Sequence, residues 1–409
     1  MAPNRSLRAP YIVNPDLERL QSYPFQKLSA LLDGTRPDPR LKPIALHIGE
    51  PKHPTPEFIK QALVDHLDGL ANYPPTLGAE ALRLAIAEWL QRRYGLEAVD
   101  PQSEIIPVNG SREALFAFAQ AVIDATHPDP VVVCPNPFYQ IYEGATLLAR
   151  ATPHYLNNLP ENGYAFAFEQ LPEEVWRRVQ LIYVCSPANP TGYVISFEEW
   201  RRLFELSDRY GFAIAADECY SEIYFDEAQP PLGALQAAQR LGRKGYPRLV
   251  MFSSLSKRSN VPGMRSGFVA GDAAILKKFL LYRTYQGCAM SPPLHAASIA
   301  AWKDETHVVE NRRLYRDKFA AVLDILRPVL EVGMPAAAFY LWPKTPLPDD
   351  EFARRLYQEQ AVSVLPGSYL ARTARGTNPG TNRVRIALVA SLAECVEAAR
   401  RIRAFVESL

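Results

Sequence analysis

The residue whose neighbours most suggest chemistry is Lys257. It ends the run SSLSK (253–257), which follows a short apolar stretch, and Arg265 comes eight residues later. A lysine amine becomes a nucleophile or a base where its surroundings lower its pKa. A lysine flanked by hydroxyls in an otherwise apolar context, with an arginine eight residues on, is unusual. Taken alone, the segment is equally typical of an exposed lysine that follows a strand.

Three more polar segments follow short apolar runs. Ser111 lies in the turn NGS (109–111), Asn189 in SPANPTG (186–192) and Asp217 in DECY (217–220). Small residues at a turn into a helix present backbone N–H groups to an anion, and a carboxylate at the end of a buried strand needs a cationic partner. Each segment alone is also typical of a helix cap, a plain turn or an ion-paired acid.

The elements that carry these segments alternate between strands and helices. Continuous apolar runs between helical stretches indicate parallel strands buried on both faces, so residues from about 45 to 295 are predicted to form an open, doubly wound α/β sheet. Ligands bind beyond the carboxyl ends of such strands. We therefore expect the four polar segments to meet in one crevice. The predicted strands are residues 44–48, 105–108, 131–134, 181–184, 212–216 and 250–252; the predicted helices are residues 56–69, 78–94, 113–125 and 197–210.

The pattern changes after residue 300. A long helix is followed by alternating strand patterns and a final helix, which indicates a smaller α+β unit. We predict an N-terminal arm (1–44) that joins the small unit, a large domain (45–300) and a small C-terminal domain (301–409), with a Pro-rich linker at 35–43. The later elements are predicted at residues 308–330, 338–342, 362–365, 383–388 and 392–409.

Composition excludes several classes of protein. The chain has 409 residues, 48% of them hydrophobic and 22% charged, and a net charge of +1. This balance is typical of a soluble globule and gives no field that would attract nucleic acid or a membrane surface. Its five cysteines are dispersed, which argues against a disulfide framework and against a metal site. Without an apolar signal-like segment, the expected location is cytoplasmic.

Four motifs, in their order and at their separations, together resemble the class I/II aminotransferases of pyridoxal-5′-phosphate (PLP) fold type I. The motifs that carry the resemblance are NPTG (189–192), DECY (217–220), SLSK (254–257) and GMR (263–265). The resemblance implies a mostly parallel seven-stranded sheet between helices, a smaller α+β C-terminal domain, and a ping-pong exchange between amino acids and keto acids. It also implies cis peptide bonds at Asn189–Pro190 and Asn136–Pro137.

By this resemblance, five side chains surround the cofactor ring. Lys257 would carry PLP as a Schiff base and move the proton between Cα and C4′. Asp217 would pair with the pyridine N–H and keep the ring cationic. Asn189 and Tyr220 would bind the 3′ oxygen, and Tyr139 would stack on the ring. Asp217 and Tyr220 are thus expected to act with Lys257 in catalysis.

The phosphate and substrate contacts are implied in the same way. The backbone of Ser111 and Arg112, the hydroxyls of Ser254 and Ser256, and the guanidinium of Arg265 would hold the phosphate.

Other residues are implied to reach the site from further away. Tyr73 matches a tyrosine that reaches the phosphate from a partner subunit, which implies a homodimer with shared active sites. Arg385 would bind the substrate α-carboxylate in a fork-to-fork pair, with Gly49 adding a backbone contact and Asn189 lying beside it. Arg383 is the competing candidate because alternation along a strand puts both arginines on one face.

Four further segments of the sequence resemble those of bacterial succinyldiaminopimelate transaminases. The segments that carry this resemblance are NPDLERL (14–20), YPF (23–25), CPNPFYQIY (134–142) and YRTYQGC (282–288). It implies N-succinyl-LL-2,6-diaminopimelate and 2-oxoglutarate as substrates in lysine biosynthesis. A distal carboxylate would need a second cation, for which the sequence leaves four candidates open: Lys27, Arg36, Arg258 and Arg283.

Alternatives on the same fold are a broad aromatic or aspartate aminotransferase and a C–S β-lyase. A transcription regulator of this fold would carry a winged-helix module and a basic surface. Only about 45 residues precede the first predicted strand and the charge is balanced, so that class is not expected.

Overall fold

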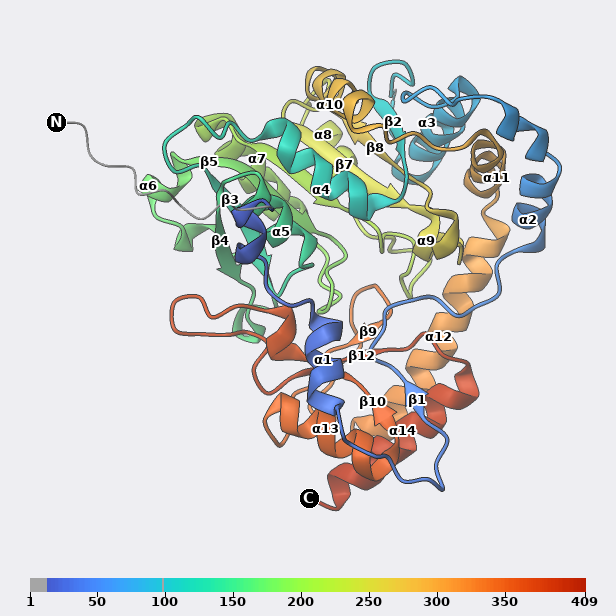
Figure 1. The fold of residues 1–409 in the computed structure, drawn as a ribbon, viewed down its shortest axis with the longest axis vertical. Helices are drawn as coiled ribbons and strands as arrows, with labels where there is room; N and C mark the ends of the chain where they lie inside the picture. Colours follow the sequence, from blue (N-terminus) through green and yellow to red (C-terminus); the bar gives the residue numbers. More distant parts are fainter. Residues whose placement is uncertain (1–12, 98) are drawn as a thin grey trace.

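The computed structural model describes residues 13–97 and 99–409 (Figure 1). A large α/β body occupies the upper part of the view, and a smaller body lies below it. We call them the sheet body and the small body. None of the helices in the described ranges is both long and apolar enough to cross a membrane.

The sheet body is built on a seven-stranded sheet in the order β2-β8-β7-β6-β5-β3-β4. Only β8 runs antiparallel to its neighbours, β2 and β7, and all other pairs are parallel. This confirms the predicted mostly parallel seven-stranded sheet. The strands are β2 (Ile105–Val108), β3 (Val131–Asn136), β4 (Thr152–Asn157), β5 (Val179–Cys185), β6 (Ala213–Asp217), β7 (Leu249–Ser254) and β8 (Gly267–Gly271).

Two of these strands, β4 and β8, were not predicted. The edge strand β4 contains a proline and stays partly exposed, so it lacks an apolar run. Strand β8 begins and ends with glycine for a steric reason. A Cβ at Gly267 would lie 2.4 Å from the Ser253 carbonyl oxygen, and one at Gly271 would lie 2.1 Å from that of Leu249.

Helices cover both faces of the sheet, and alternate strand residues feed two separate cores. In β7, Leu249 and Met251 pack into one core, whereas Val250 and Phe252 pack into the other. This burial on both faces explains why the sequences of the parallel strands are continuously apolar. The first core includes α3 (Glu80–Tyr94), α7 (Phe197–Tyr210), α8 (Ala234–Arg240) and α11 (Pro292–Lys303); the second includes α4 (Ser111–Val122), α5 (Ile141–Leu148) and α10 (Ala273–Gln286).

The small body has its own apolar core between short strands and three long helices. Its antiparallel sheet has the order β11-β12-β9, and β1 pairs in parallel with β10. Helix α1 (Pro24–Leu32) packs on α13 and β11. The domain bounds at 44/45 and 300/301 stay a prediction. The elements are β1 (Ile44–Ala45), β9 (Tyr340–Leu341), β10 (Val362–Ser363), β11 (Leu365–Pro366), β12 (Val384–Ala387), α12 (Thr306–Leu326), α13 (Asp349–Gln360) and α14 (Leu392–Glu407).

Several predicted bounds differ from the observed ones. The predicted helix 56–69 is observed as α2 (Glu57–Val64) followed by a 3-10 turn, Leu67–Ala71. Helix α12 stops at Leu326 because Pro328 has no N–H to continue it. Helix α4 begins two residues early, directly after Gly110, which has a φ of +83°. Short helices α6 (Glu173–Trp176) and α9 (Leu255–Arg258) complete the α-helices of the described chain.

Candidate active site

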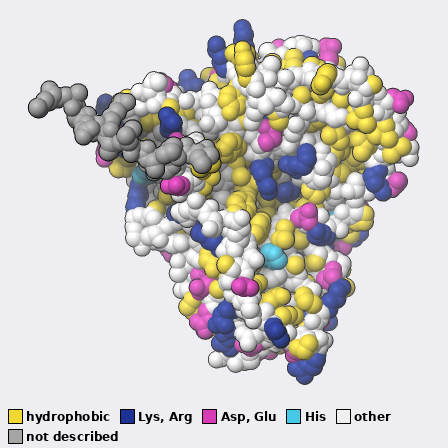
Figure 2. All heavy atoms as spheres, viewed as in Figure 1, with side chains coloured by type: hydrophobic (Ala, Val, Ile, Leu, Met, Phe, Trp, Pro, Cys, Tyr) yellow, Lys and Arg dark blue, Asp and Glu magenta, His cyan; other side chains and the backbone are white. Residues whose placement is uncertain are grey.

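A cavity of about 560 Å³ opens where the carboxyl ends of the sheet strands face the small body. Figure 2 shows Lys and Arg side chains grouped in the hollow in the middle of this face. Of the thirteen residues predicted for the site, eleven line the cavity: Gly49, Ser111, Arg112, Tyr139, Asn189, Asp217, Tyr220, Ser256, Lys257, Arg265 and Arg385. The predicted crevice at the strand tips is therefore present.

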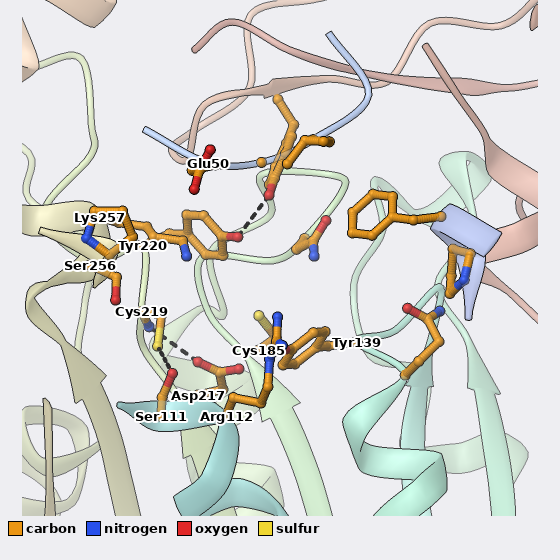
Figure 3. A pocket seen from close by; sticks show the side chains of 18 of the residues that line it. Glu50, Ser111, Arg112, Tyr139, Cys185, Asp217, Cys219, Tyr220, Ser256 and Lys257 are labelled. Atoms are coloured by element: carbon orange, nitrogen blue, oxygen red, sulfur yellow. Dashed lines mark hydrogen bonds between the residues drawn. The ribbon is translucent and has the colours of Figure 1, made fainter. Parts of the chain in front are cut away.

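Lys257 enters the cavity directly after β7, on the single turn of α9. The Ser254 hydroxyl caps this turn by accepting the Ser256 N–H at 3.1 Å. The Lys257 Nζ lies 6.0 Å from the centre of the Tyr220 ring, and Figure 3 shows the two side chains next to each other. Burial lowers the pKa of the Lys257 amine, although the nearby Cys219 and Asp217 act in the opposite direction. A less basic amine is suited to nucleophilic and proton-transfer chemistry.

Asp217, at the end of β6, is buried, with only 4% of its surface exposed. The Tyr142 hydroxyl donates to its Oδ2 at 2.6 Å, and the Cys219 N–H donates to its Oδ1 at 3.2 Å. Burial raises the pKa of Asp217, while these bonds and Lys257 oppose the rise. Within residues 13–97 and 99–409 no basic side chain forms an ion pair with it. Such a carboxylate suits a ligand that brings a positively charged N–H.

Helix α4 begins at the cavity with an uncapped N-terminus. Gly110 precedes it, and no side chain caps its first N–H groups in the described structure. A Cβ at Gly110 would lie 2.2 Å from Nη2 of Arg265, so only glycine lets this guanidinium approach the helix. Free N–H groups beside a guanidinium form a favourable site for a phosphate.

Further polar groups complete this anion site. The Cys219 thiol donates to the Ser111 hydroxyl at 2.9 Å, as Figure 3 shows. Arg112 Nε donates to the Tyr139 hydroxyl at 2.7 Å. This bond leaves the remaining N–H groups of Arg112 available to an anion and fixes the Tyr139 ring in the cavity wall.

Two predicted residues do not line the cavity. The Ser254 side chain is buried; its hydroxyl donates to the Ser266 carbonyl at 3.1 Å and lies 2.9 Å from the Ser256 hydroxyl, which donates to it. Its observed place is thus beneath the site, where it shapes the α9 turn. Tyr73 is fully exposed in the loop between the 3-10 turn Leu67–Ala71 and α3.

Arg385 projects from β12 of the small body into the opposite end of the cavity. It is 4% exposed, and its two terminal nitrogens donate to Asn189 Oδ1 at 3.0 Å and to the His47 carbonyl at 2.9 Å. The guanidinium lies over the Tyr340 ring at 4.6 Å. The Tyr340 hydroxyl is 2.8 Å from the Tyr220 hydroxyl. Sequence reasoning did not find Tyr340, which links Arg385 to the lysine end.

The competing arginine occupies another place. Arg383 donates to the Trp342 carbonyl at 3.0 Å and lines a separate cavity of about 290 Å³. Gly49 lies close to Tyr340, whose hydroxyl would be 2.0 Å from a Cβ at position 49. Any larger residue there would displace the ring under Arg385.

Of the four candidates for a distal cation, none lines the cavity. Arg258 is buried and pairs with Glu305 at 2.5 Å. Arg283 is fully buried, and its Nη1 donates to both carboxylate oxygens of Glu113, at 2.7 and 2.8 Å. Both are therefore already neutralised elsewhere.

Two further features of the structure concern the peptide bonds before proline and the residues that could bind a metal. The cis bonds at Asn189–Pro190 and Asn136–Pro137 are confirmed, and Ser186–Pro187 is also cis. In the described part of the chain, no cluster of His, Cys, Asp or Glu could hold a metal ion.

Comparison with known proteins agrees with this geometry. Residues 42–402 match the family "Aminotransferase class I and II". An LL-diaminopimelate aminotransferase from Desulforudis audaxviator is 31% identical over 394 residues, which cover 95% of this chain and 96% of that protein. A crystal structure of an aminotransferase from Neisseria meningitidis has 53% sequence identity and a TM-score of 0.93, covering 96% of this chain and all of that one. A probable N-succinyldiaminopimelate aminotransferase from Thermus thermophilus has 26% identity and a TM-score of 0.83, covering 94% and 100%.

These matches span nearly the whole described chain, including both bodies and the cavity between them. Members of the matched family depend on PLP, which agrees with a lysine, a buried acid and an anion site in one cavity. The chain is therefore a member of the class I and II aminotransferase family.

Proposed function

We propose that this aminotransferase holds PLP on Lys257 and transfers the amino group of N-succinyl-LL-2,6-diaminopimelate to 2-oxoglutarate. The observation that carries the proposal is the pair at the tips of β7 and β6. The Lys257 amine and the Asp217 carboxylate share one cavity, and neither has an ion-pair partner in the described chain. Such a pair is costly to keep without a ligand that binds both.

The residues present fit the cofactor. The uncapped α4 terminus, Arg265 and Arg112 match a phosphate, and the close approach of Arg265 to Gly110 shows a cradle that a Cβ would fill. Asp217 matches a protonated ring nitrogen, and Tyr139 offers an aromatic wall. When bound, PLP supplies an electron sink for negative charge at the substrate Cα.

The protein's own groups would do the rest. Arg385 would take the substrate α-carboxylate, since a planar guanidinium matches two carboxylate oxygens. The Lys257 amine, less basic because it is buried, would accept the Cα proton and return it. The Tyr220 hydroxyl, which is 2.8 Å from the Tyr340 hydroxyl, would bind the 3′ oxygen of the cofactor ring. The same groups would serve both half-reactions, which gives ping-pong kinetics.

Support for the succinylated substrate comes from the segments that resemble succinyldiaminopimelate transaminases. Residues 23–25 and 139–140 of those segments line the cavity, where they can contact the distal part of a substrate. The relative from Desulforudis audaxviator favours a second candidate, LL-diaminopimelate itself. The two substrates differ at the distal amine, which is free in one and acylated in the other.

We also propose a homodimer with Tyr73 reaching the partner's phosphate site. Support comes from its full exposure and from the exposed Leu67 and Leu70 in the 3-10 turn just before it. The mass in solution by light scattering tests this; a monomer would contradict it.

The first experiment tests the cofactor lysine. Purified protein with added PLP should be yellow, and Lys257→Ala should lose both the colour and at least about a thousandfold in activity. Lys278→Ala removes an exposed lysine on α10 and should behave like the wild type. Unchanged colour and activity in Lys257→Ala would refute the assignment.

The second experiment decides the substrate. Rates of amino transfer to 2-oxoglutarate should give the highest kcat/KM with N-succinyl-LL-diaminopimelate. Faster transfer from LL-diaminopimelate, aspartate or phenylalanine would refute the succinyl assignment while leaving an aminotransferase. Pyruvate and ammonia released from cystathionine without any keto acid would indicate a C–S β-lyase instead.

A further inference from the structure

A chain of hydrogen bonds connects a buried lysine of the small body to the main chain of Lys257. Lys318 on α12 donates from Nζ to Nε2 of His53 at 2.6 Å. The Nδ1 of His53 is 2.7 Å from Oδ1 of Asn311. Nδ2 of Asn311 donates to the carbonyl oxygen of Lys257 at 3.3 Å. None of Lys318, His53 and Asn311 lines the active-site cavity.

We call this chain of hydrogen bonds from Lys318 through His53 and Asn311 to the Lys257 carbonyl the relay. The direction of every bond in it is fixed. The Lys257 carbonyl can only accept, so Asn311 must present its NH₂ group there and its oxygen to the other side. That oxygen also accepts from Nδ2 of Asn260 at 3.1 Å. His53 must therefore carry its proton on Nδ1 and accept from Lys318 at Nε2. Burial lowers the pKa of His53, which favours this neutral form.

Lys318 is an unusual residue for its position. It is 2% exposed, and no carboxylate of the described chain lies within ion-pair distance of its Nζ. Its other contacts are the Val389 carbonyl at 3.4 Å and the face of the Tyr315 ring at 5.1 Å. A buried amine without a counter-charge is costly, and a methionine would fill the same space without that cost. The presence of Lys318 is explained if the hydrogen bond that it donates to His53 has a role.

The charges that face the relay are few. Glu394 and Cys395 of α14 face Lys318 and act to raise its pKa, and Glu310 of α12 acts in the same way on His53. Burial is the largest influence on both groups and acts to lower the pKa of each. If His53 gained a proton, two cations would meet and the Lys318 bond would be lost.

The relay lies where three segments meet. His53 belongs to the segment between β1 and α2, which crosses from the small body to the sheet body (Figure 1). Gly49 of the same segment lines the cavity. Helix α12 makes the same crossing and carries Asn311 and Lys318. The Thr55 hydroxyl donates to the Asn260 carbonyl at 2.8 Å, which ties the crossing segment to the turn after α9.

We propose that Lys318, His53 and Asn311 are positioning residues that hold the Lys257 turn against α12 and so set where its amine lies in the cavity. This role rests on the proposed function of Lys257. The relay is complete only while His53 is neutral, so its hold on the turn weakens in acid.

Two variants break the relay at opposite ends. Asn311→Asp keeps the shape and the acceptor for His53 but removes the donor to the Lys257 carbonyl. Lys318→Met removes the charge and the donor at the far end. Lys278→Met, an exposed lysine changed in the same way, is the control. Amide hydrogen exchange is measured on the full-length protein, with and without added PLP.

In both variants, exchange in residues 255–260 should be about tenfold faster than in the wild type, since a lost hydrogen bond is worth about one decade. Exchange in β5 should not change. With PLP bound, the pH midpoint of the visible absorbance change should shift in both variants and not in Lys278→Met. A purely structural role would lower the melting temperature without moving this midpoint.

Unchanged exchange in residues 255–260 together with an unmoved midpoint in Asn311→Asp would overturn the proposal, whether or not Lys318→Met folds. A wild-type protein that never turns yellow would instead refute the proposed function. The exchange measured without PLP would still decide whether the relay holds the turn.

Discussion

Lys318 makes the stability of this protein depend on pH in a way that can be worked out. Burial lowers the pKa of its amine from 10.5 to about 8. At about 1.4 kcal/mol for each pH unit, charging this amine in the folded protein costs about 3 kcal/mol. Between pH 8 and 10.5 the unfolded chain binds more protons at this site than the folded chain. The free energy of unfolding therefore rises with pH across that interval, and the full cost is present below pH 8.

Lys318→Met removes the charge and with it this slope. At neutral pH, relief of the charging cost is offset by the loss of the bond to His53, worth about 1–3 kcal/mol. The variant should therefore unfold within about 2 kcal/mol of the wild type at pH 7. From pH 7 to pH 10 the wild type should then gain about 2 kcal/mol relative to the variant.

Urea unfolding at pH 7, 8, 9 and 10 measures this difference, at fixed protein and PLP concentration because both ligand and subunit binding shift the midpoint. Lys278→Met makes the same chemical change on the surface. Its free energy of unfolding should change with pH in the same way as that of the wild type. Parallel curves for the wild type and Lys318→Met above pH 8 would refute the reasoning, since they would show that Lys318 is not the group that titrates.

Two further predictions concern the cofactor end of the cavity. Gly110→Ala should weaken PLP binding by at least about tenfold, measured by absorbance titration, because the new Cβ lies 2.2 Å from Arg265 and φ is +83°; equal affinity would contradict the proposed phosphate cradle. Tyr142→Phe removes a hydrogen bond that holds down the pKa of Asp217, so the acid limb of the kcat profile should move to higher pH. A profile identical to the wild type would show that this bond does not tune the acid.

The part of the site that sequence predicted best is the part at strand tips. Lys257 and Asp217 each lie at or just beyond the end of a short continuous apolar run, which is typical of a buried parallel strand, so their place at the sheet edge followed from topology. Tyr142 was missed because it lies on α5 and meets Asp217 across 75 residues. Tyr340 was missed because its hydroxyl meets that of Tyr220 across 120 residues, so no local pattern placed the two together.

The relay was also outside what sequence reasoning found, although a signal existed. Tyr315, Lys318, Phe319 and Val322 recur at helical spacing, and all four are buried on one face of α12. A lysine is rarely buried unless it is paired, so a lysine inside such an apolar stripe predicts a polar partner. That partner, His53, is 265 residues away and lies in a segment without regular structure, so no local pattern pointed to it.

One short segment, residues 47–53, connects both ends of the site. Its His47 carbonyl accepts from Arg385, which is proposed to take the substrate carboxylate, and its His53 belongs to the relay that reaches Lys257. Arg385 belongs to the small body and Lys257 to the sheet body, so the distance between carboxylate and amine depends on how the two bodies are joined. A segment bonded to both can fix that distance only if its own bonds hold. The buried relay does this away from the cavity, where neither substrate nor cofactor competes for its hydrogen bonds.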